Sequence, residues 1–454
     1  MMSFVRVFTA VLTIALGPVI SDVTDASAQT TSSSQWSRIW DSERLDRPIA
    51  PLWTHETVEQ EVQRIRRQAG DLVAVETMGR SLEGRALYHL QAGQGPFGVL
   101  LWSQMHGDEP SATPALFDLL EYLRRHQNEP AVARLLGALT IHIVPMLNAD
   151  GAQRFERRNG QGIDVNRDAL RLQTPEGQAL KALRDRLNPR LGFNLHNQNW
   201  RTSVGKPPQP AAISLLAVAF DEARTENEGR RLAKRVCSVI RDAIEPLAEG
   251  RIGRYDDAFE VRAFGDNVTK WGTPVVLIEA GPWPGVDAES VLTRLNFVGI
   301  MSALEALASG SVEQADPARY EMLPINDSML FHTLIVNATI AAGTGAAPFI
   351  GDVGIVASRR VTGTGAGRRV ELAGEIEDVG DLRVFGALET IDATGKWLAP
   401  APDGVKVGAE VALPVSKNRQ GVILPGRRAH LMVLTPGTRP GRYRVERVIR
   451  FAEQ

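Results

Sequence analysis

The sequence contains a single cysteine, Cys237, among its 454 residues. One thiol cannot form an intramolecular disulfide, and it cannot supply a zinc cluster built on several cysteines. Any metal site in this chain must therefore use histidine, aspartate or glutamate side chains.

The sequence also lacks an excess of positive charge. Its 51 Lys and Arg are balanced by 53 Asp and Glu, which gives a formal net charge of −2. Nucleic-acid binding through phosphate neutralisation usually requires a basic excess, so we expect no nucleic-acid partner. Hydrophobic residues make up 43% and charged residues 23%, close to the averages of globular proteins. The length favours two or three folded domains.

Long apolar runs are missing as well. The apolar run at residues 7–20 follows the basic Arg6 and precedes the small residues ASA at 26–28. A bilayer span needs roughly 20 apolar residues, so this pattern is more typical of a secretory signal peptide cleaved near Ala28. We therefore interpret residues 1–28 as a signal peptide, with an uncleaved membrane anchor as the alternative. We expect the protein to be exported, periplasmic or secreted, with no membrane span in the mature chain.

The rest of the chain divides into three parts by its pattern. Residues 29–49 are interpreted as a Ser/Thr-rich arm. Residues 50–310 alternate short buried strands with amphipathic helices, which predicts an α/β domain with helices on both faces of a mainly parallel or mixed sheet. Residues 320–454 carry short β-branched runs separated by Gly, Pro and Asp, which predicts a smaller all-β domain. The strands expected in this second domain are 334–340, 369–372, 382–385, 411–415, 430–434 and 443–449.

Two histidines and a glutamate form a candidate metal site. His106 and Glu109 are three residues apart, directly after the expected strand at 98–102. His196 follows another buried strand, and the carboxyl ends of strands in an open α/β sheet are where ligand sites form. A catalytic zinc site needs three protein ligands and an open position. Taken alone, this spacing is equally compatible with a His106 that caps a loop and a buried, hydrogen-bonded His196.

Further polar residues follow the same strands. Glu279 ends the apolar strand at 275–278, where burial can raise the pKa of a carboxylate and suit it to act as a general base. A salt-bridged or strand-terminating Glu279 is the alternative. Arg157, Arg167 and Asn166 could hold a substrate carboxylate or a developing oxyanion, although isolated surface arginines are common.

These residues together resemble the zinc carboxypeptidase family of metallopeptidases. The likeness covers about residues 50–300 and follows the order of the family's motifs. The matching stretches are GRSLEGR (79–85), MHGDEP (105–110), VPMLNADG (144–151), RRN (157–159), GIDVNRD (162–168), FNLH (193–196) and VLIEAG (276–281).

The resemblance implies one Zn²⁺ per chain, bound by His106, Glu109 and His196. It implies that Asp164 accepts the ring N–H of His106 and that Glu279 is the general base. It also implies the roles of the residues that contact substrate. Asn166 and Arg167 would bind the terminal carboxylate of a peptide, and Arg157, or alternatively Arg158, would polarise the scissile carbonyl.

Two positions are less well determined. Tyr255 is the only nearby candidate for the family's mobile tyrosine, and the residues after His196 match no single subfamily. Asp266 lies where the pocket for the terminal side chain is expected. An inward-pointing Asp266 would favour a basic residue, whereas a solvated turn aspartate is the alternative.

The implied activity is metal-assisted hydrolysis of the C-terminal amide bond of a peptide with a free carboxylate. One alternative is a zinc-dependent deacylase of N-acyl amino acids, of the aspartoacylase or succinylglutamate desuccinylase type. Another is a non-catalytic binding module with the same fold.

Residues 334–355 show a local likeness to the opening strands of D-aminoacylase-type amidohydrolases, but no His-x-His follows. His332 and His430 are therefore interpreted as packing or surface residues. The sequence gives no indication of the oligomeric state.

Overall fold

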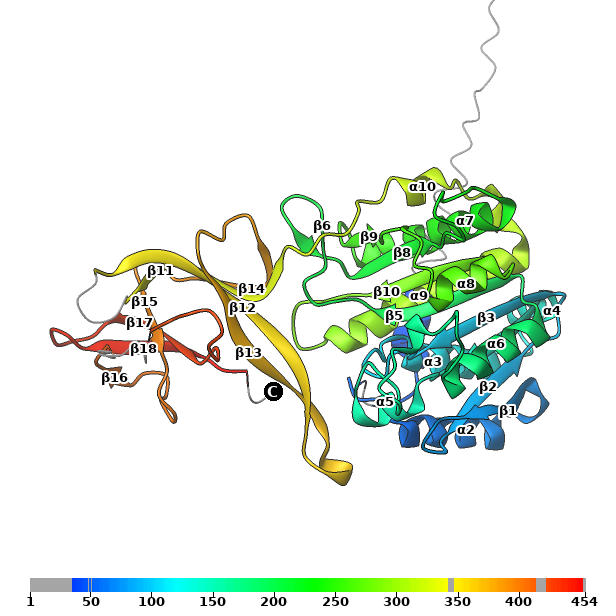
Figure 1. Cartoon of the computed structure of the whole chain (residues 1–454), viewed down its shortest axis with the longest axis horizontal. Helices are drawn as coiled ribbons and strands as arrows, with labels where there is room; N and C mark the ends of the chain where they lie inside the picture. Colours follow the sequence, from blue (N-terminus) through cyan, green and yellow to red (C-terminus); the bar gives the residue numbers. More distant parts are fainter. Residues whose placement is uncertain (1–34, 48, 50, 342–346, 414–421, 452–454) are drawn as a thin grey trace, which may run out of the picture.

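The computed structural model describes residues 35–47, 49, 51–341, 347–413 and 422–451. The predicted signal peptide (1–28) lies outside these residues, and so do residues 414 and 415 of one expected strand. Figure 1 shows an α/β domain on one side and a narrower, elongated β domain on the other, connected by the chain that leads into β11.

The α/β domain is built on an eight-stranded sheet in the order β1-β2-β4-β3-β5-β10-β8-β9. Its centre is parallel, because β3 pairs in parallel with β4 and β5, and β5 with β10. The pairs β1–β2, β2–β4 and β10–β8 are antiparallel, so the sheet is mixed. Its strands are β1 (Val73–Arg80), β2 (Ala86–Ala92), β3 (Phe97–Ser103), β4 (Leu139–Val144), β5 (Leu191–Asn197), β8 (Ile213–Ala217), β9 (Ile252–Arg254) and β10 (Val275–Ala280).

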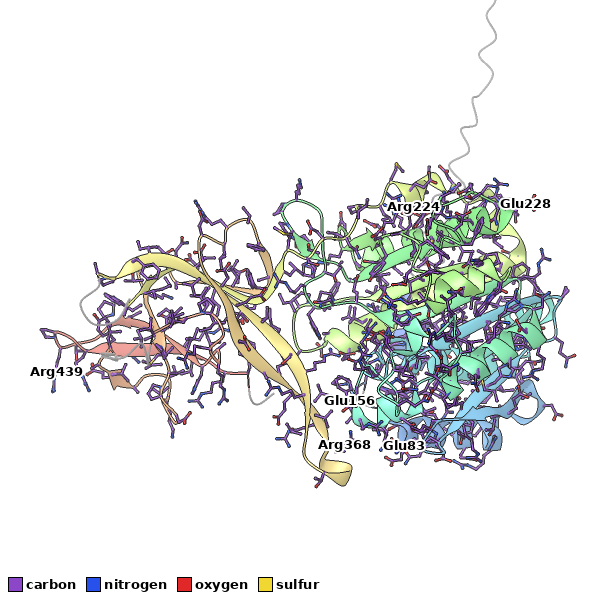
Figure 2. All side chains as sticks on the ribbon, viewed as in Figure 1. Glu83, Glu156, Arg224, Glu228, Arg368 and Arg439 are labelled. Atoms are coloured by element: carbon purple, nitrogen blue, oxygen red, sulfur yellow. The ribbon has the colours of Figure 1, made fainter. Side chains whose placement is uncertain are left out.

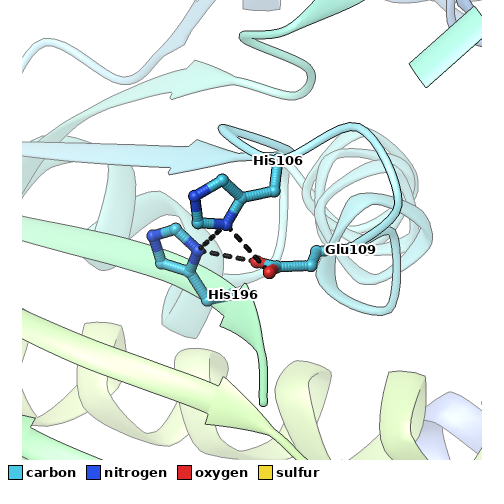
Figure 3. Close-up of side chains that lie close together, drawn as sticks. All are labelled: His106, Glu109 and His196. Atoms are coloured by element: carbon cyan, nitrogen blue, oxygen red, sulfur yellow. Dashed lines mark hydrogen bonds and ion pairs between the residues drawn. The ribbon is translucent and has the colours of Figure 1, made fainter. Parts of the chain in front are cut away.

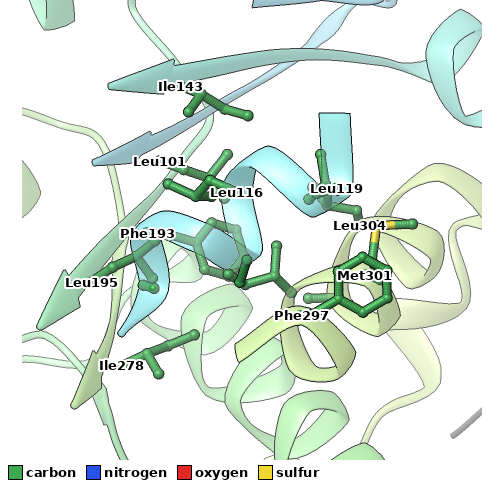
Figure 4. Packing of buried hydrophobic residues seen from close by; sticks show 14 of the residues in the cluster. Leu101, Leu116, Leu119, Ile143, Phe193, Leu195, Ile278, Phe297, Met301 and Leu304 are labelled. Carbon is green, nitrogen blue, oxygen red and sulfur yellow. The ribbon is translucent and has the colours of Figure 1, made fainter. Parts of the chain in front are cut away.

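Helices cover both faces of this sheet, as the sequence predicted. On one face, Leu101 and Phe193 pack against Leu116 of α3 and Phe297 of α9 (Figure 4). On the other face, Leu100 and its neighbours pack against α6 and α8. Each fully buried side chain of this size contributes about 1.5–3 kcal/mol. The helices are α2 (His55–Gln68), α3 (Ala112–Arg125), α4 (Pro130–Ala138), α5 (Ala149–Arg154), α6 (Pro175–Leu187), α7 (Glu228–Ile244), α8 (Phe264–Lys270), α9 (Ala288–Ser309) and α10 (Ala318–Glu321).

One helix is unusually apolar. Within the described part of the chain, α9 alone is long and apolar enough to cross a membrane, and 78% of its most apolar window is buried. It packs between α3 and α7, so the structure accounts for its composition as that of a core helix.

The described part of the expected Ser/Thr-rich arm (29–49) contains a helix. The helix spans residues 35–43. Its Trp36 and Trp40 are buried in the main core, and the two indole N–H groups donate to Glu305 (3.0 Å) and Asp118 (3.1 Å). The Ser/Thr-rich residues before them led to the prediction of an arm. Burial of the two indole rings outweighs the polar character of these neighbours and holds this segment on the core.

The β domain contains a twisted sheet in the order β13-β12-β11-β15-β17-β18-β16, with β14 paired to β11. The expected strand at 382–385 is wrong. Leu382 and Phe385 instead close a turn, in which the Phe385 N–H donates to the Leu382 carbonyl (3.0 Å) directly after Gly380 and Asp381. The strands are β11 (Leu330–Ile340), β12 (Phe349–Thr362), β13 (Arg369–Gly380), β14 (Gly386–Asp392), β15 (Trp397–Pro400), β16 (Glu410–Val411), β17 (Leu431–Pro436) and β18 (Tyr443–Ile449). A separate two-stranded ribbon pairs β6 (Ser203–Val204) with β7 (Gln209–Pro210), and β7 contacts β14.

Candidate metal centre

A short loop between β3 and α3 carries His106 and Glu109. Gly107 is required between them, because a Cβ at this position would lie 2.1 Å from the backbone N of Ala152. The loop therefore packs directly on the backbone at α5. The side chain of Gln104 also holds this loop, because its Nε2 donates to the Gly107 carbonyl (3.2 Å).

His196 meets this loop from the end of β5, and the three side chains converge (Figure 3). One carboxylate oxygen of Glu109 lies 2.8 Å from His106 Nδ1, and the other lies 2.7 Å from His196 Nδ1. The two Nδ1 atoms are 3.2 Å apart. All three residues are buried.

The arrangement fits a zinc ion. Two imidazole nitrogens and a carboxylate face one point, and two histidines with a glutamate are a ligand set that catalytic zinc sites use. Zn–N bonds of 2.0–2.1 Å in tetrahedral geometry separate two ligand nitrogens by roughly 3.3 Å, close to the 3.2 Å seen between the histidines. His106, Glu109 and His196 are also the group of residues that could hold a metal ion in the described part of the chain.

Asp164 and Arg157 surround His106 on its other side. Asp164 Oδ1 lies 3.1 Å from His106 Nε2, and Arg157 Nε donates to Asp164 Oδ2 (3.0 Å). Burial opposes ionisation of Asp164, but His106 and Arg157 hold the pKa of its carboxyl well below its usual range. The carboxylate can thus fix the ring orientation and tautomer of His106, as metal-binding histidines usually require.

Arg157 also contacts the metal ligands directly. Its NH1 group lies 3.1 Å from Glu109 Oε1 and 3.2 Å from His106 Nδ1. A metal ion held by His106 Nδ1 would compete with the second of these contacts, and Arg157 itself lines the cleft. Arg158, the alternative considered from the sequence, does not line the cleft and donates to the Gly162 carbonyl instead (3.1 Å).

Glu279 lies beside the metal ligands. It is in register with His196 on the parallel pair β10–β5, and its side chain lines the same cleft. Burial, with the nearby Glu109 charge, raises the pKa of Glu279 well above its usual range. A bound cation would lower it again, toward the value that suits a general base.

The cleft has a volume of about 520 Å³ and brings together the remaining predicted substrate residues, Asn166, Arg167 and Tyr255. Asn166 Oδ1 accepts from the backbone N–H of Phe264 (2.8 Å), which leaves its amide N–H₂ available. The charge of Glu279 and burial raise the pKa of Tyr255 to about 12, so its hydroxyl stays protonated and can donate.

Two further acceptors line this cleft: Asp266, whose orientation the sequence left open, and Asn194, which was not predicted from the sequence. Asp266 lines it, and burial raises the pKa of this carboxyl to about 7. Asn194, two residues before His196 on β5, lines it as well, and its buried Oδ1 has no hydrogen-bond partner among the described residues. The position of Asn194 could have been anticipated, because residues i and i+2 of a strand face the same side.

Comparison with known proteins supports the resemblance seen in the sequence. Residues 58–208 match the family model described as zinc carboxypeptidase. The matched part of the chain contains all three proposed metal ligands, in agreement with the resemblance inferred from the sequence motifs.

Curated relatives are distant and longer. A probable carboxypeptidase 2 of Arthroderma benhamiae is 25% identical over 239 residues, which cover 50% of this chain and 43% of the relative. Carboxypeptidase E of Caenorhabditis elegans is 30% identical over 132 residues, which cover 24% of this chain and 28% of that protein. The chain thus spans less than half the length of these relatives. A metallo-carboxypeptidase from Burkholderia cenocepacia superposes with a TM-score of 0.46 and 16% identity, over 58% of this chain and 71% of that one.

Proposed function

We propose that this chain, whose residues 58–208 match the zinc carboxypeptidase family model, is a zinc metallocarboxypeptidase that removes the C-terminal residue of peptides. One observation carries the proposal. The candidate metal ligands His106 and Glu109 line a single cleft together with Glu279, a buried carboxyl of raised pKa, and with Asn166 and Arg167, two side chains that could bind a carboxylate.

Asn166 and Arg167 would select the end of the substrate. An arginine fork and an amide N–H₂ can bind a free carboxylate bidentately. Because both side chains share the cleft with the metal ligands, they would hold the terminal carboxylate at a fixed distance from the scissile bond. This constraint favours an exopeptidase over an endopeptidase.

Glu279 would act as the general base and Arg157 as the carbonyl donor. A zinc ion held by His106, Glu109 and His196 would supply a Lewis acid and a water of lowered pKa. Glu279 would take the proton from the attacking water and return it to the leaving amine. Arg157 would donate to the carbonyl oxygen as negative charge develops there, and Tyr255 could add a second donor.

Asp266 and Asn194 would determine the preferred terminal residue. Both present oxygen acceptors to the cleft, and Asp266 can carry a negative charge at neutral pH. We therefore propose a preference for a basic C-terminal residue, whose charged end would satisfy both groups.

Export is a further part of the proposal. It is supported by the apolar run at 7–20 and the ASA sequence at 26–28. An exported enzyme would act on peptides outside the cytoplasm. N-terminal sequencing of the secreted or periplasmic protein should begin at Gln29, and a chain that retains residues 1–28 would contradict the proposal.

The decisive experiment compares three substrates on zinc-loaded protein. We expect hydrolysis of a peptide with a free C-terminus and none of the same peptide when it is amidated. Cleavage that ignores amidation would indicate an endopeptidase. Hydrolysis of N-acyl amino acids alone would favour the deacylase alternative, and absence of bound zinc would overturn the proposal.

A further inference from the structure

The carboxylate of Glu109 divides the metal centre into two hydrogen-bonded sides. Its Oε1 atom faces His106 and Arg157, on the side of Asp164. Its Oε2 atom faces His196 and accepts from the backbone N–H of Asn197 (3.2 Å). The first side contains the residues assigned above, whereas the second continues into residues with no assigned role.

The second side runs from Asn197 to the first turn of α9. The Asn197 side chain forms two hydrogen bonds with Ser111, one from Nδ2 to the Ser111 hydroxyl (2.5 Å) and one from the Ser111 N–H to Oδ1 (3.1 Å). The Ser111 hydroxyl in turn donates to Glu289 Oε2 (3.1 Å). Ser111 is buried, with 1% of its surface exposed, so little water competes for these bonds.

The chain of contacts ends on the β domain. Glu289 forms an ion pair with Arg359 of β12, and both side chains are largely enclosed, with 14% of Arg359 and 12% of Glu289 exposed. The Arg359 guanidinium also lies over the ring of Trp200, 4.3 Å from its centroid. Arg359 is the one described residue of the β domain that lines the metal cleft.

The β12–β13 hairpin is held against the α/β domain at further points. Arg201 forms an ion pair with Glu377 of β13. Near the tip, Arg368 and Arg369 share a surface pocket with residues at the start of α2 (Figure 2, where Arg368 is labelled). Arg359 is therefore presented to the cleft by a hairpin that is ion-paired to the α/β domain through Glu377 and lies close to it again near the tip.

We propose that Arg359 is a positioning residue of the metal centre. Through Glu289, Ser111 and Asn197 it fixes the orientation of the Glu109 carboxylate, and metal retention thus depends on the β domain. The assignment rests on the metal site of the proposed function. Groups that orient metal ligands affect metal affinity about 10–100-fold, and we expect the lower end here because Arg359 acts through three intervening residues.

The test measures zinc affinity of the full chain by competition with a chromophoric chelator. Arg359→Ala should weaken zinc binding about 10-fold, and Arg359→Lys should restore most of it. Arg360→Ala is the matched control, because Arg360 is an exposed neighbour on the same strand and faces the other side. An equal loss in Arg360→Ala, or no loss in Arg359→Ala, would overturn the assignment.

A second variant separates positioning from simple domain docking. Ser111→Ala interrupts the path but leaves the Arg359–Glu289 ion pair in place. It should weaken zinc binding at least as much as Arg359→Ala, and the double variant should be no weaker than Ser111→Ala alone. Additive losses would show that Arg359 acts by another route. Wild-type protein that binds no zinc would refute the proposed function itself, which is a different result.

Discussion

Glu279 and His196 occupy facing positions on two parallel strands, β10 and β5. The proposed general base and one proposed metal ligand are therefore positioned by the backbone hydrogen bonds of the central sheet, and not by a loop. Sites built on such elements hold their geometry within narrow limits. The two functions should nevertheless be separable by mutation.

Glu279→Gln keeps the shape of the side chain but removes the base. We expect kcat to fall about 10²–10⁴-fold, with one zinc per chain still bound. Elemental analysis and steady-state kinetics on the same preparation measure both quantities. His196→Ala is the control and should lose the metal together with the activity. A Glu279→Gln variant that keeps its activity would contradict the assigned role.

Arg157 and Arg158 offer a matched pair on adjacent positions. Arg157→Ala should lower kcat by about 10²–10³-fold, since one donor to an oxyanion is worth about 3 kcal/mol. Arg158→Ala should leave kcat unchanged, because this side chain donates to the Gly162 carbonyl outside the cleft. A reversed result would mean that the family motif is shifted by one residue.

Zinc affinity should depend on pH through His106. Although burial lowers it, the charge of Glu109 and the bond to Asp164 raise the pKa of His106 in the metal-free protein to about 9. Zinc must displace this proton, so the apparent affinity should rise by up to about 10-fold per pH unit below pH 9 and then level off. Competition titrations between pH 6 and 10 test this.

His106 should also make the stability of the metal-free protein depend on pH, but here stability should fall as the pH rises. The raised pKa of His106 contributes its full stabilisation below the unfolded-state pKa of about 6.5. That contribution is lost as the pH rises through about 9. Asp164→Asn removes one cause of the shift and should move both pH dependences to lower pH.

The sequence predicted the centre of the α/β domain because its strands are continuous apolar runs. β5 and β10 are buried on both faces, and continuous apolar runs of this length are typical of central parallel strands covered by helices on both sides. The edge strands were not predicted, since β9 is only three residues long and β1 is half exposed. The long hairpin of β12 and β13 was also missed beyond 369–372, because its alternation is interrupted by glycines and exposed charges.

The site was predictable where residues lie at strand ends. His106, Glu109, His196 and Glu279 all follow from this rule, together with the family motifs. The ion pair between Arg359 and Glu289 could not be predicted, because the two residues come from separate domains and neither lies in a sequence pattern that indicates a partner. The orientation of Asp266 was equally undetermined, since a polar residue in the first turn of a helix can face solvent or a cleft.

That orientation leads to a prediction about substrate preference. Asp266 lines the cleft, and burial raises the pKa of its carboxyl to about 7. The ratio of kcat/KM for a C-terminal Arg over a C-terminal Leu should therefore increase as the pH rises from 6 to 8. Asp266→Asn should lower this ratio and remove its pH dependence. An unchanged ratio would mean that Asp266 does not contact the terminal side chain.

Asp266→Asn should also change stability in a pH-dependent way. A buried carboxyl of raised pKa favours folding while it is protonated, and this contribution is lost as the pH rises through about 7. The neutral amide avoids the cost of burying a charge, so the variant should melt higher than wild type at pH 8, and the difference should be clearly smaller at pH 5. Thermal unfolding at both pH values measures the difference. A variant that is destabilised equally at both would instead show that Asp266 stabilises its turn through the hydrogen bond it accepts from the Glu260 N–H (2.9 Å).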